Sequence, residues 1–221
     1  MKRGRGGMEE SEMRSAIEEL SLVVKDKPSG INPDAAYLPT KPFLYTCNLL
    51  IQVLDKIGPT MAVLRQDIHQ NIQKLDKMYE SDPSVYSNVV EILKKEAREG
   101  IARKPSSCSR ALVWLTRSMD FTVNLLEKLE KDVAQSLEQV VEDAYITTLK
   151  PWHGWISSAA YKVALKLIPE RKAFIKLLIA EEEDYDMLKE EMRELISLLL
   201  PLLDDIHSIL RSFHLDKLKA K

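Results

Sequence analysis

The amino-acid sequence predicts an all-α fold, and two observations support this prediction. The first is the scarcity of turn residues: the chain has 7 glycines, three of them within residues 1–7, too few for the tight turns of a β protein. The second is periodicity, because no segment alternates apolar and polar residues for long, whereas several repeat apolar residues at helical spacing. Prolines and Ser/Asp pairs divide the chain into segments of helical length.

The N-terminal part of the chain predicts two helices. Residues 1–10 form a basic N-terminus that we expect to be disordered, and a first helix covers 11–26. A loop at 31–39 leads to a second helix that Thr40 caps, with Pro42 in its first turn, where proline is tolerated. This second helix is expected to end before a Gly-Pro pair at 58–59.

The middle of the chain predicts four further helices. The first covers 61–78, and a Ser-Asp-Pro sequence ends it. The next covers 84–103 and precedes a Pro-Ser loop. The two that follow cover 108–131, which is strongly apolar, and 133–149.

Three helices complete the chain. Pro151 opens one that runs to residue 168, a short one covers 170–180, and a long one covers 183–212, in which Pro201 is expected to kink or break the helix. The total is eight or nine helices, and 221 residues suffice for one domain with a substantial core.

The segment 61–78 carries two neighbouring stripes of different chemistry. Its apolar stripe, which we expect to face the core, comprises Met61, Leu64, Ile68, Ile72, Leu75 and Met78. Beside it lie Asp67, Asn71 and Lys74, at positions i, i+4 and i+7. An acid, an amide and an ammonium in line offer acceptors and donors suited to a polyhydroxylated head group. The alternative is an ordinary solvated face with a helical polar ladder.

Composition excludes several classes of function. Lys plus Arg is 32 and Asp plus Glu is 34, and the resulting net charge of −2 gives no electrostatic case for a nucleic-acid partner. Two isolated cysteines, Cys47 and Cys108, indicate neither a disulfide framework nor a zinc site. Catalytic motifs are absent, so we expect no enzyme, no cofactor and no metal. Without a signal sequence or an apolar run of membrane-spanning length, the chain is expected to be cytosolic.

Two aromatic segments stand out. Arg110, Trp114 and Arg117 fall at i, i+4 and i+7, so two guanidiniums flank an indole that can stack on a sugar ring. The alternative is a core tryptophan with snorkelling arginines. In the second segment, Lys150, Trp152, His153 and Trp155 crowd one helix start. A neutral imidazole can donate to an amide carbonyl, and Trp with Lys suits a membrane interface; the alternative is a packed helix corner.

Three motifs in this order, Asp67-xxx-Asn71-xx-Lys74, Leu112-Val-Trp-Leu-Thr-Arg117 and Trp152-His-Gly-Trp155, resemble the glycolipid transfer protein family. Within the family, the plant members resemble this chain most, through the segments Thr-Lys-Pro-Phe-Leu at 40–44 and Leu-Lys-Leu-Ile-Pro at 165–169. The resemblance covers residues 12–215 and implies a transfer domain over 11–215, with a tail at 216–221. It also implies a two-layer α-helical sandwich of about eight helices, with a surface head-group site above an apolar pocket for lipid chains.

The same resemblance implies a role for each site residue. Asp67, Asn71 and Lys74 would hydrogen-bond the sugar, Trp114 would be the platform beneath it, and His153 would bind the sphingoid amide carbonyl. Asp67 would also meet the amide N–H. Membrane contact would fall to Trp155 and its neighbours Trp152 and Lys150.

The expected function is that of a monomeric, non-enzymatic sphingolipid carrier that touches membranes transiently. The family's phosphate-selective branch, which carries ceramide-1-phosphate, resembles this chain at Arg110 but has basic residues where Asn71 and Trp114 stand. Because paired guanidiniums bind phosphate, this departure favours a neutral head group, with Arg110 and Arg117 as phosphate or accessory contacts in the alternative. A ceramide-1-phosphate carrier, a lipid-sensing adaptor and a purely structural helical domain remain alternatives.

Overall fold

A computed structural model describes residues 12–25, 36–132, 134–179 and 184–220 of the chain. The expected disorder of residues 1–10 and most of the loop at 31–39 lie outside the described residues. Within them the all-α prediction is confirmed: regular structure is helical, and one isolated antiparallel bridge joins Pro39 to Asn88.

The first half of the chain forms five α-helices and one 3₁₀ turn. They are α1 (Glu12–Lys25), α2 (Thr40–Ile57), η1 (Pro59–Met61), α3 (Ala62–Ser81), α4 (Pro83–Tyr86) and α5 (Val89–Arg98). The second half forms five more. They are α6 (Cys108–Lys131), α7 (Leu137–Thr148), α8 (Trp155–Leu165), α9 (Arg171–Leu178) and α10 (Tyr185–Ser212).

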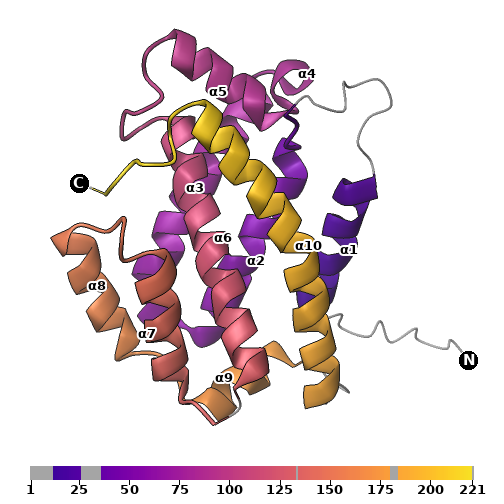
Figure 1. The fold of residues 1–221 in the computed structure, drawn as a ribbon, viewed down its shortest axis with the longest axis vertical. Coiled ribbons are helices and arrows are strands. Elements are labelled where there is room, and N and C mark those ends of the chain that lie inside the picture. The colour runs from indigo at the N-terminus through magenta and orange to yellow at the C-terminus, as the bar shows by residue number, and fades with distance from the viewer. Residues whose placement is uncertain (1–11, 26–35, 133, 180–183, 221) are drawn as a thin grey trace, which may run out of the picture.

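Helix α6 lies at the centre of the fold. It packs against α3 on one side and α10 on the other, while α1 joins α2 to α10 and so closes a ring of five helices. Figure 1 shows α6, α7, α8 and α10 in a front layer, with α2 and α3 behind them. Almost every helix contributes fully buried apolar side chains to one core, among them Phe43, Leu75, Ile92, Leu112, Leu115 and Leu188. The two-layer sandwich that the motifs implied is therefore confirmed.

One predicted helix, 84–103, is in fact two. Asn88 has an extended backbone, and its side chain accepts from the amide of Val90 and so caps α5. The second half ends at Arg98, because Gly100 adopts a positive φ of 68° that terminates the helix. The predicted capping by Thr40 is also wrong, since its hydroxyl donates to the carbonyl of Tyr86, 2.6 Å away, and ties α2 to α4.

Two proline predictions also need correction. The helix expected to open at Pro151 begins at Trp155, because residues 149–154 form a turn in which the amides of Trp152 and His153 both donate to the carbonyl of Leu149. Helix α10 runs through Pro201 without a break. Buried leucines on either side of it, such as Leu199 and Leu203, hold the helix against the core despite the missing amide donor. In the described ranges, none of the helices combines the length and hydrophobicity needed to cross a bilayer.

Candidate functional site

The polar stripe of α3 is confirmed as a feature of one helix, but its members differ in exposure. Asn71 is buried, at 7% exposure, and its amide donates to the carbonyl of Asp67 at 3.0 Å. Lys74 is half-buried and donates to the carbonyl of Pro105 at 3.4 Å. A wholly solvated ladder is therefore not what the structure shows.

Asp67 is exposed by surface area, yet the protein around it removes enough water to raise its pKa above the ordinary value. The ammonium of Lys74 opposes this shift with a smaller effect. A carboxylate that is accessible and poorly solvated at once is typical of a group at the rim of a depression.

The predicted apolar stripe faces the core at Met61, Ile72 and Leu75, and Ile68 packs against the core, but Leu64 does not lie in it. Ile72 and Leu75 are buried, whereas all residues from 62 to 67 are exposed, including Val63 at 75% and Leu64 at 39%. The prediction that Leu64 lies in the core is therefore wrong, since its side chain is 39% exposed. Apolar surface is left accessible beside Asp67.

Helices α3 and α6 pack against each other and run in opposite directions (Figure 1). The thiol of Cys108, at the start of α6, donates to the carbonyl of Lys74 at 3.3 Å. From that contact, seven residues back along α3 reach Asp67, and seven residues forward along α6 reach Leu115, next to Trp114. Both steps cover about 10 Å of helix.

Helix α6 is held at its first turn by a buried carboxylate. Glu96 of α5 is 3% exposed, and its oxygens accept from the amides of Cys108 and Ser109, at 2.8 and 2.7 Å, and from the Ser109 hydroxyl at 2.6 Å. These donors would otherwise have no partner at a helix start, and their dipole favours a negative charge there. The position of Trp114 along α6 is thereby set from α5.

His153 lies beside Trp114, as predicted. The centroids of the two rings are 5.7 Å apart, and the Tyr145 ring lies 5.5 Å away on α7. The Tyr145 hydroxyl is 3.3 Å from Nδ1 of His153 and 3.3 Å from Oγ of Ser158. Burial, and then the charge of Arg117, lower the pKa of His153, so the imidazole is neutral at pH 7.

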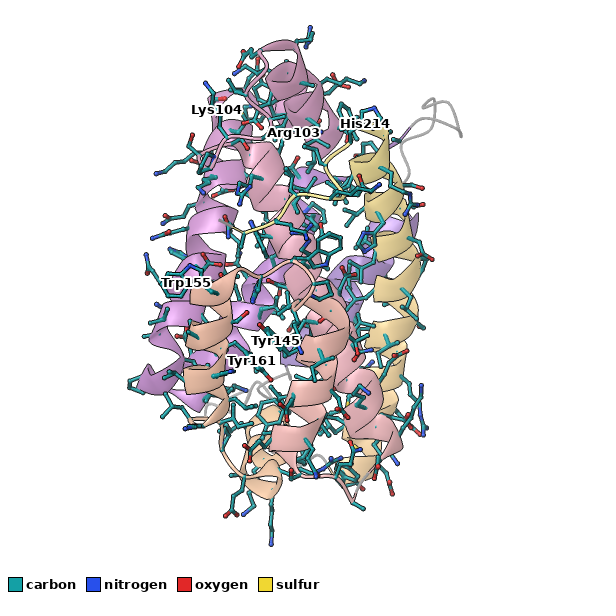
Figure 2. The ribbon with its side chains drawn as sticks, turned by 60° about the vertical axis from the view of Figure 1, so that its left-hand side comes forward. Arg103, Lys104, Tyr145, Trp155, Tyr161 and His214 are labelled. Carbon is teal, nitrogen blue, oxygen red and sulfur yellow. The ribbon has the colours of Figure 1, made fainter. Side chains whose placement is uncertain are left out.

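Tyr145 is a site residue that sequence reasoning missed. It is buried at 4% and stacks on Tyr161 of α8, with centroids 3.4 Å apart and planes 5° from parallel. Figure 2 shows the two rings between α7 and α8. No local signal points to it, since it lies eight residues before His153 and meets that ring only because the chain reverses at the turn.

Arg110 and Arg117 both bind the last residues of the chain. We call residues 214–220 the C-terminal tail; Arg110 donates to the carbonyl of Lys219 at 2.8 Å and Arg117 to that of Asp216 at 3.1 Å. Arg103 likewise donates to the carbonyl of His214 at 2.9 Å, and these two residues lie together in Figure 2. The predicted phosphate contacts thus have backbone partners in this structure, and Arg117 is only 4% exposed.

The predicted membrane-contact residues differ in position. Trp155 is 81% exposed at the start of α8 and extends outward in Figure 2, and Lys150 is also exposed. Trp152 instead stacks on the guanidinium of Arg117, whose central carbon lies 4.1 Å from its ring. Its geometry favours an internal role.

A cavity of about 170 Å³ lies behind Trp152, between α6, α10 and the tail. Its lining combines apolar side chains such as Val113 and Leu210 with the charged or titratable groups of Arg117, Asp120, His207 and Asp216. Because ligand pockets usually measure about 300 to 1,000 Å³, this cavity does not serve the chains of a lipid. Within the described part of the chain no cluster of three or more His, Cys, Asp or Glu side chains has the arrangement of a metal site.

Comparison with known proteins agrees with the fold and the motifs. The family model "Glycolipid transfer protein (GLTP)" matches residues 38–180. The chain is also 56% identical to glycolipid transfer protein 3 and 52% identical to glycolipid transfer protein 2 of Arabidopsis thaliana, in each case over all of both chains. The chain therefore belongs to the glycolipid transfer protein family.

Solved structures of lower identity share the fold. A FAPP2 structure, described as selecting simple glycosphingolipids with the GLTP fold, has a TM-score of 0.76 at 24% identity and covers 85% of this chain and 92% of its own. A mutant of Arabidopsis accelerated-cell-death 11 complexed with ceramide-1-phosphate has a TM-score of 0.80 at 19% identity and covers 94% and 98%. At these identities the likeness concerns the architecture alone.

Proposed function

We propose that this protein carries a sphingolipid with an uncharged, sugar-bearing head group between membranes, without covalent chemistry. Family membership supports lipid transfer as the activity. The head-group assignment rests on the indole of Trp114 beside a neutral imidazole at His153, with the exposed, poorly solvated carboxylate of Asp67 expected at the same level on the neighbouring helix α3. Acceptors, a stacking platform and a donor together match a sugar joined to an amide.

A neutral head group is favoured by the arginines. Phosphate binding requires guanidiniums that a ligand can reach, whereas Arg117 is only 4% exposed and both Arg110 and Arg117 are held at carbonyls of the tail. The remaining cation beside the site, Lys74, shares its surroundings with Asp67, whose charge opposes a phosphate. Trp114 offers a face for a sugar ring where a phosphate site would need a charge.

His153 is suited to hold the amide of the lipid. The single hydrogen of the Tyr145 hydroxyl can go to Oγ of Ser158 or to Nδ1 of His153, each 3.3 Å away. The Nε2–H tautomer, which donates to a carbonyl, leaves Nδ1 free to accept that hydrogen. The carboxylate of Asp67 would accept from the amide N–H. In this arrangement His153 binds the carbonyl of the ceramide amide and Asp67 binds its N–H.

The lipid chains require apolar surface, and α8 together with α3 offers it. None of the described side chains of α8 is buried, although Trp155 and Val163 are large and apolar, at 81% and 62% exposure. Val63 and Leu64 expose further apolar surface on α3. We infer that the lipid chains lie against these exposed apolar side chains, with Trp155 and Lys150 at the membrane surface.

The physical need for such a carrier is large. At about 0.8 kcal/mol per methylene, moving a lipid with roughly thirty chain methylenes into water costs on the order of 20 kcal/mol. A carrier that receives the chains directly from the bilayer removes most of this cost. We propose that the protein works as a monomer in the cytosol and meets membranes only transiently.

Vesicle-to-vesicle transfer of labelled glucosylceramide, free ceramide and ceramide-1-phosphate tests the proposal. We expect glucosylceramide to move fastest, because only its head group engages both Asp67 and Trp114. Faster transfer of ceramide-1-phosphate would overturn the neutral preference, and no acceleration for any of the three would end the carrier proposal. Tight binding with negligible transfer would favour a lipid-sensing adaptor, and absence of binding a structural domain.

Replacing Tyr145 by Phe is expected to lower glucosylceramide transfer by about threefold to tenfold. The phenyl ring retains the stacking on Tyr161, whereas Nδ1 of His153 loses the hydroxyl that can orient the imidazole. Tyr161→Phe is the matched control, because the Tyr161 hydroxyl is buried without a hydrogen-bond partner among the described residues. Equal transfer by both variants would show that Tyr145 does not orient His153.

A further inference from the structure

Arg117 is the most deeply buried cation beside the proposed head-group site. Its side chain is 4% exposed, and its pKa is lowered to about 10, chiefly by burial. One nitrogen, Nη2, donates to the carbonyl of Asp216, whereas Nη1 is buried without a hydrogen-bond partner among the described residues. Burial of a cation with an unpaired donor lowers the stability of the fold. The presence of Arg117 at this position therefore calls for a compensating role.

The guanidinium of Arg117 lies between two indoles. Its central carbon is 4.9 Å from the ring of Trp114 and 4.1 Å from that of Trp152. Cation–π attraction is strongest in such desolvated surroundings, and the flat guanidinium can stack on a ring face where an ammonium cannot. Through these contacts Arg117 connects the proposed sugar platform on α6 to the turn that carries His153.

The C-terminal tail contacts both Arg117 and the turn that carries His153. Leu215 of the tail is buried at 1%, and the amide of Ala220 donates to the carbonyl of Trp152 at 2.8 Å. Since Arg117 holds the tail at Asp216 and the tail holds the turn at Trp152, the turn is fixed from both sides. Loss of Arg117 would release the indole of Trp152 and weaken this link.

The position of Arg117 also bears on the charge of His153. The charged or titratable groups that the structure records around that imidazole are Arg117 on α6 and Tyr145 on α7. The carboxylates of Asp120 and Asp216 face Arg117 from the cavity side and favour its charged form, whereas the positive charge of Arg110 disfavours that form. The positive charge of Arg117 therefore disfavours protonation of His153.

We propose that Arg117 is a positioning residue of the head-group site, which sets the plane of Trp114 and the place of His153 without touching the lipid. This inference rests on the proposed function and deepens it. It assigns specificity for the sugar to a side chain behind the site. It also gives Arg117 a role different from a phosphate contact, consistent with its burial.

The experiment compares Arg117→Met and Arg117→Lys with the wild type. Both variants are expected to lower glucosylceramide transfer about tenfold and free ceramide transfer no more than about threefold, because the sugar alone uses the Trp114 face. Lysine is expected not to rescue, since an ammonium cannot stack between two indoles. Arg98→Met is the control, because Arg98 is exposed on α5 and donates to Lys94 of its own helix.

Two measurements without lipid accompany the transfer assay. The tryptophan emission of the free protein should change in both Arg117 variants, because the guanidinium leaves the faces of two of its 3 tryptophans. Trypsin should also cleave faster at Lys217 and Lys219 once the tail is less firmly held, since both lysines are exposed. Neither change is expected in Arg98→Met.

Several outcomes would overturn the inference. One is transfer of both lipids at the wild-type rate by both variants, and another is an equal fall for both lipids together with a large fall in Tm, which indicates a purely structural role. If Arg117→Met does not fold, Trp152→Leu is the second variant, since it removes one of the two indoles that contact the guanidinium but keeps the cation. Unchanged glucosylceramide transfer in Trp152→Leu would refute the proposal. A wild type that transfers no glucosylceramide refutes the proposed function instead, and the two lipid-free measurements then decide whether Arg117 holds the turn.

Discussion

Replacement of Asp67 by Val is expected to reduce glucosylceramide transfer at least about tenfold while leaving Tm unchanged or raising it. Burial raises the pKa of the Asp67 carboxylate, so at any pH above that pKa the ionised group disfavours the folded state. Replacing Asp67 therefore removes an unfavourable contribution to the free energy of folding. It also removes the group that would accept hydrogen bonds from the lipid. Transfer assays paired with thermal unfolding at pH 7 measure both effects.

The opposite signs of these two effects make the Asp67 result informative. Gln70→Val is the control, because Gln70 is exposed on the same helix and the loss of helix propensity on changing to valine is larger for glutamine than for aspartate. A fall in Tm in Asp67→Val, without one in the control, would mean that Asp67 stabilises the fold as an ion-pair partner. Full transfer by the variant would remove Asp67 from the proposed site.

Replacement of Glu96 by Ala is expected to lower the free energy of unfolding by about 3 kcal/mol, which corresponds to about 9 °C in Tm for a domain of this size. The variant leaves the amides of Cys108 and Ser109 buried without their acceptor, together with the Ser109 hydroxyl. It also removes a negative charge from the N-terminus of α6. Chemical and thermal unfolding measure the loss.

Glu99→Ala provides the comparison for Glu96. Glu99 follows α5 and pairs with Lys95 at 3.8 Å at the surface, where such pairs contribute about 0 to 1 kcal/mol. The folded fraction of Glu96→Ala should still bind glucosylceramide, because Glu96 contacts the first turn of α6 and not the ring of Trp114. Equal stability of the two variants would show that solvent replaces the buried carboxylate.

Helix-forming segments could be predicted because helical periodicity and proline are local properties of the chain. The apolar repeats that predicted α6 and α10 agree with the helices that form. The errors lie where a contact from elsewhere overrides the local signal. Thr40 has the chemistry of a cap, yet its hydroxyl is taken by the carbonyl of Tyr86, 46 residues later in the chain.

The candidate site was predicted in part, through residues whose spacing on one helix is informative. Asp67, Asn71 and Lys74 lie on one stripe because the helix repeats. The pairing of Trp114 with His153 was expected from the family motifs, and the rings do lie 5.7 Å apart. Sequence reasoning did not show that Trp152 faces inward while Trp155 faces outward, since both flank the same short turn.

From the sequence by itself follow the all-α class, the segments that become helices, and the family to which the chain belongs, because all three depend on residue types at fixed separations along the chain. Only the tertiary structure decided which polar groups are free to meet a ligand. Arg110 and Arg117 are chemically suited to phosphate, but the tail whose carbonyls accept from them comes from the far end of the chain. Desolvation at Asp67 and His153 likewise arises from neighbours brought together by packing, and no spacing along the chain encodes it.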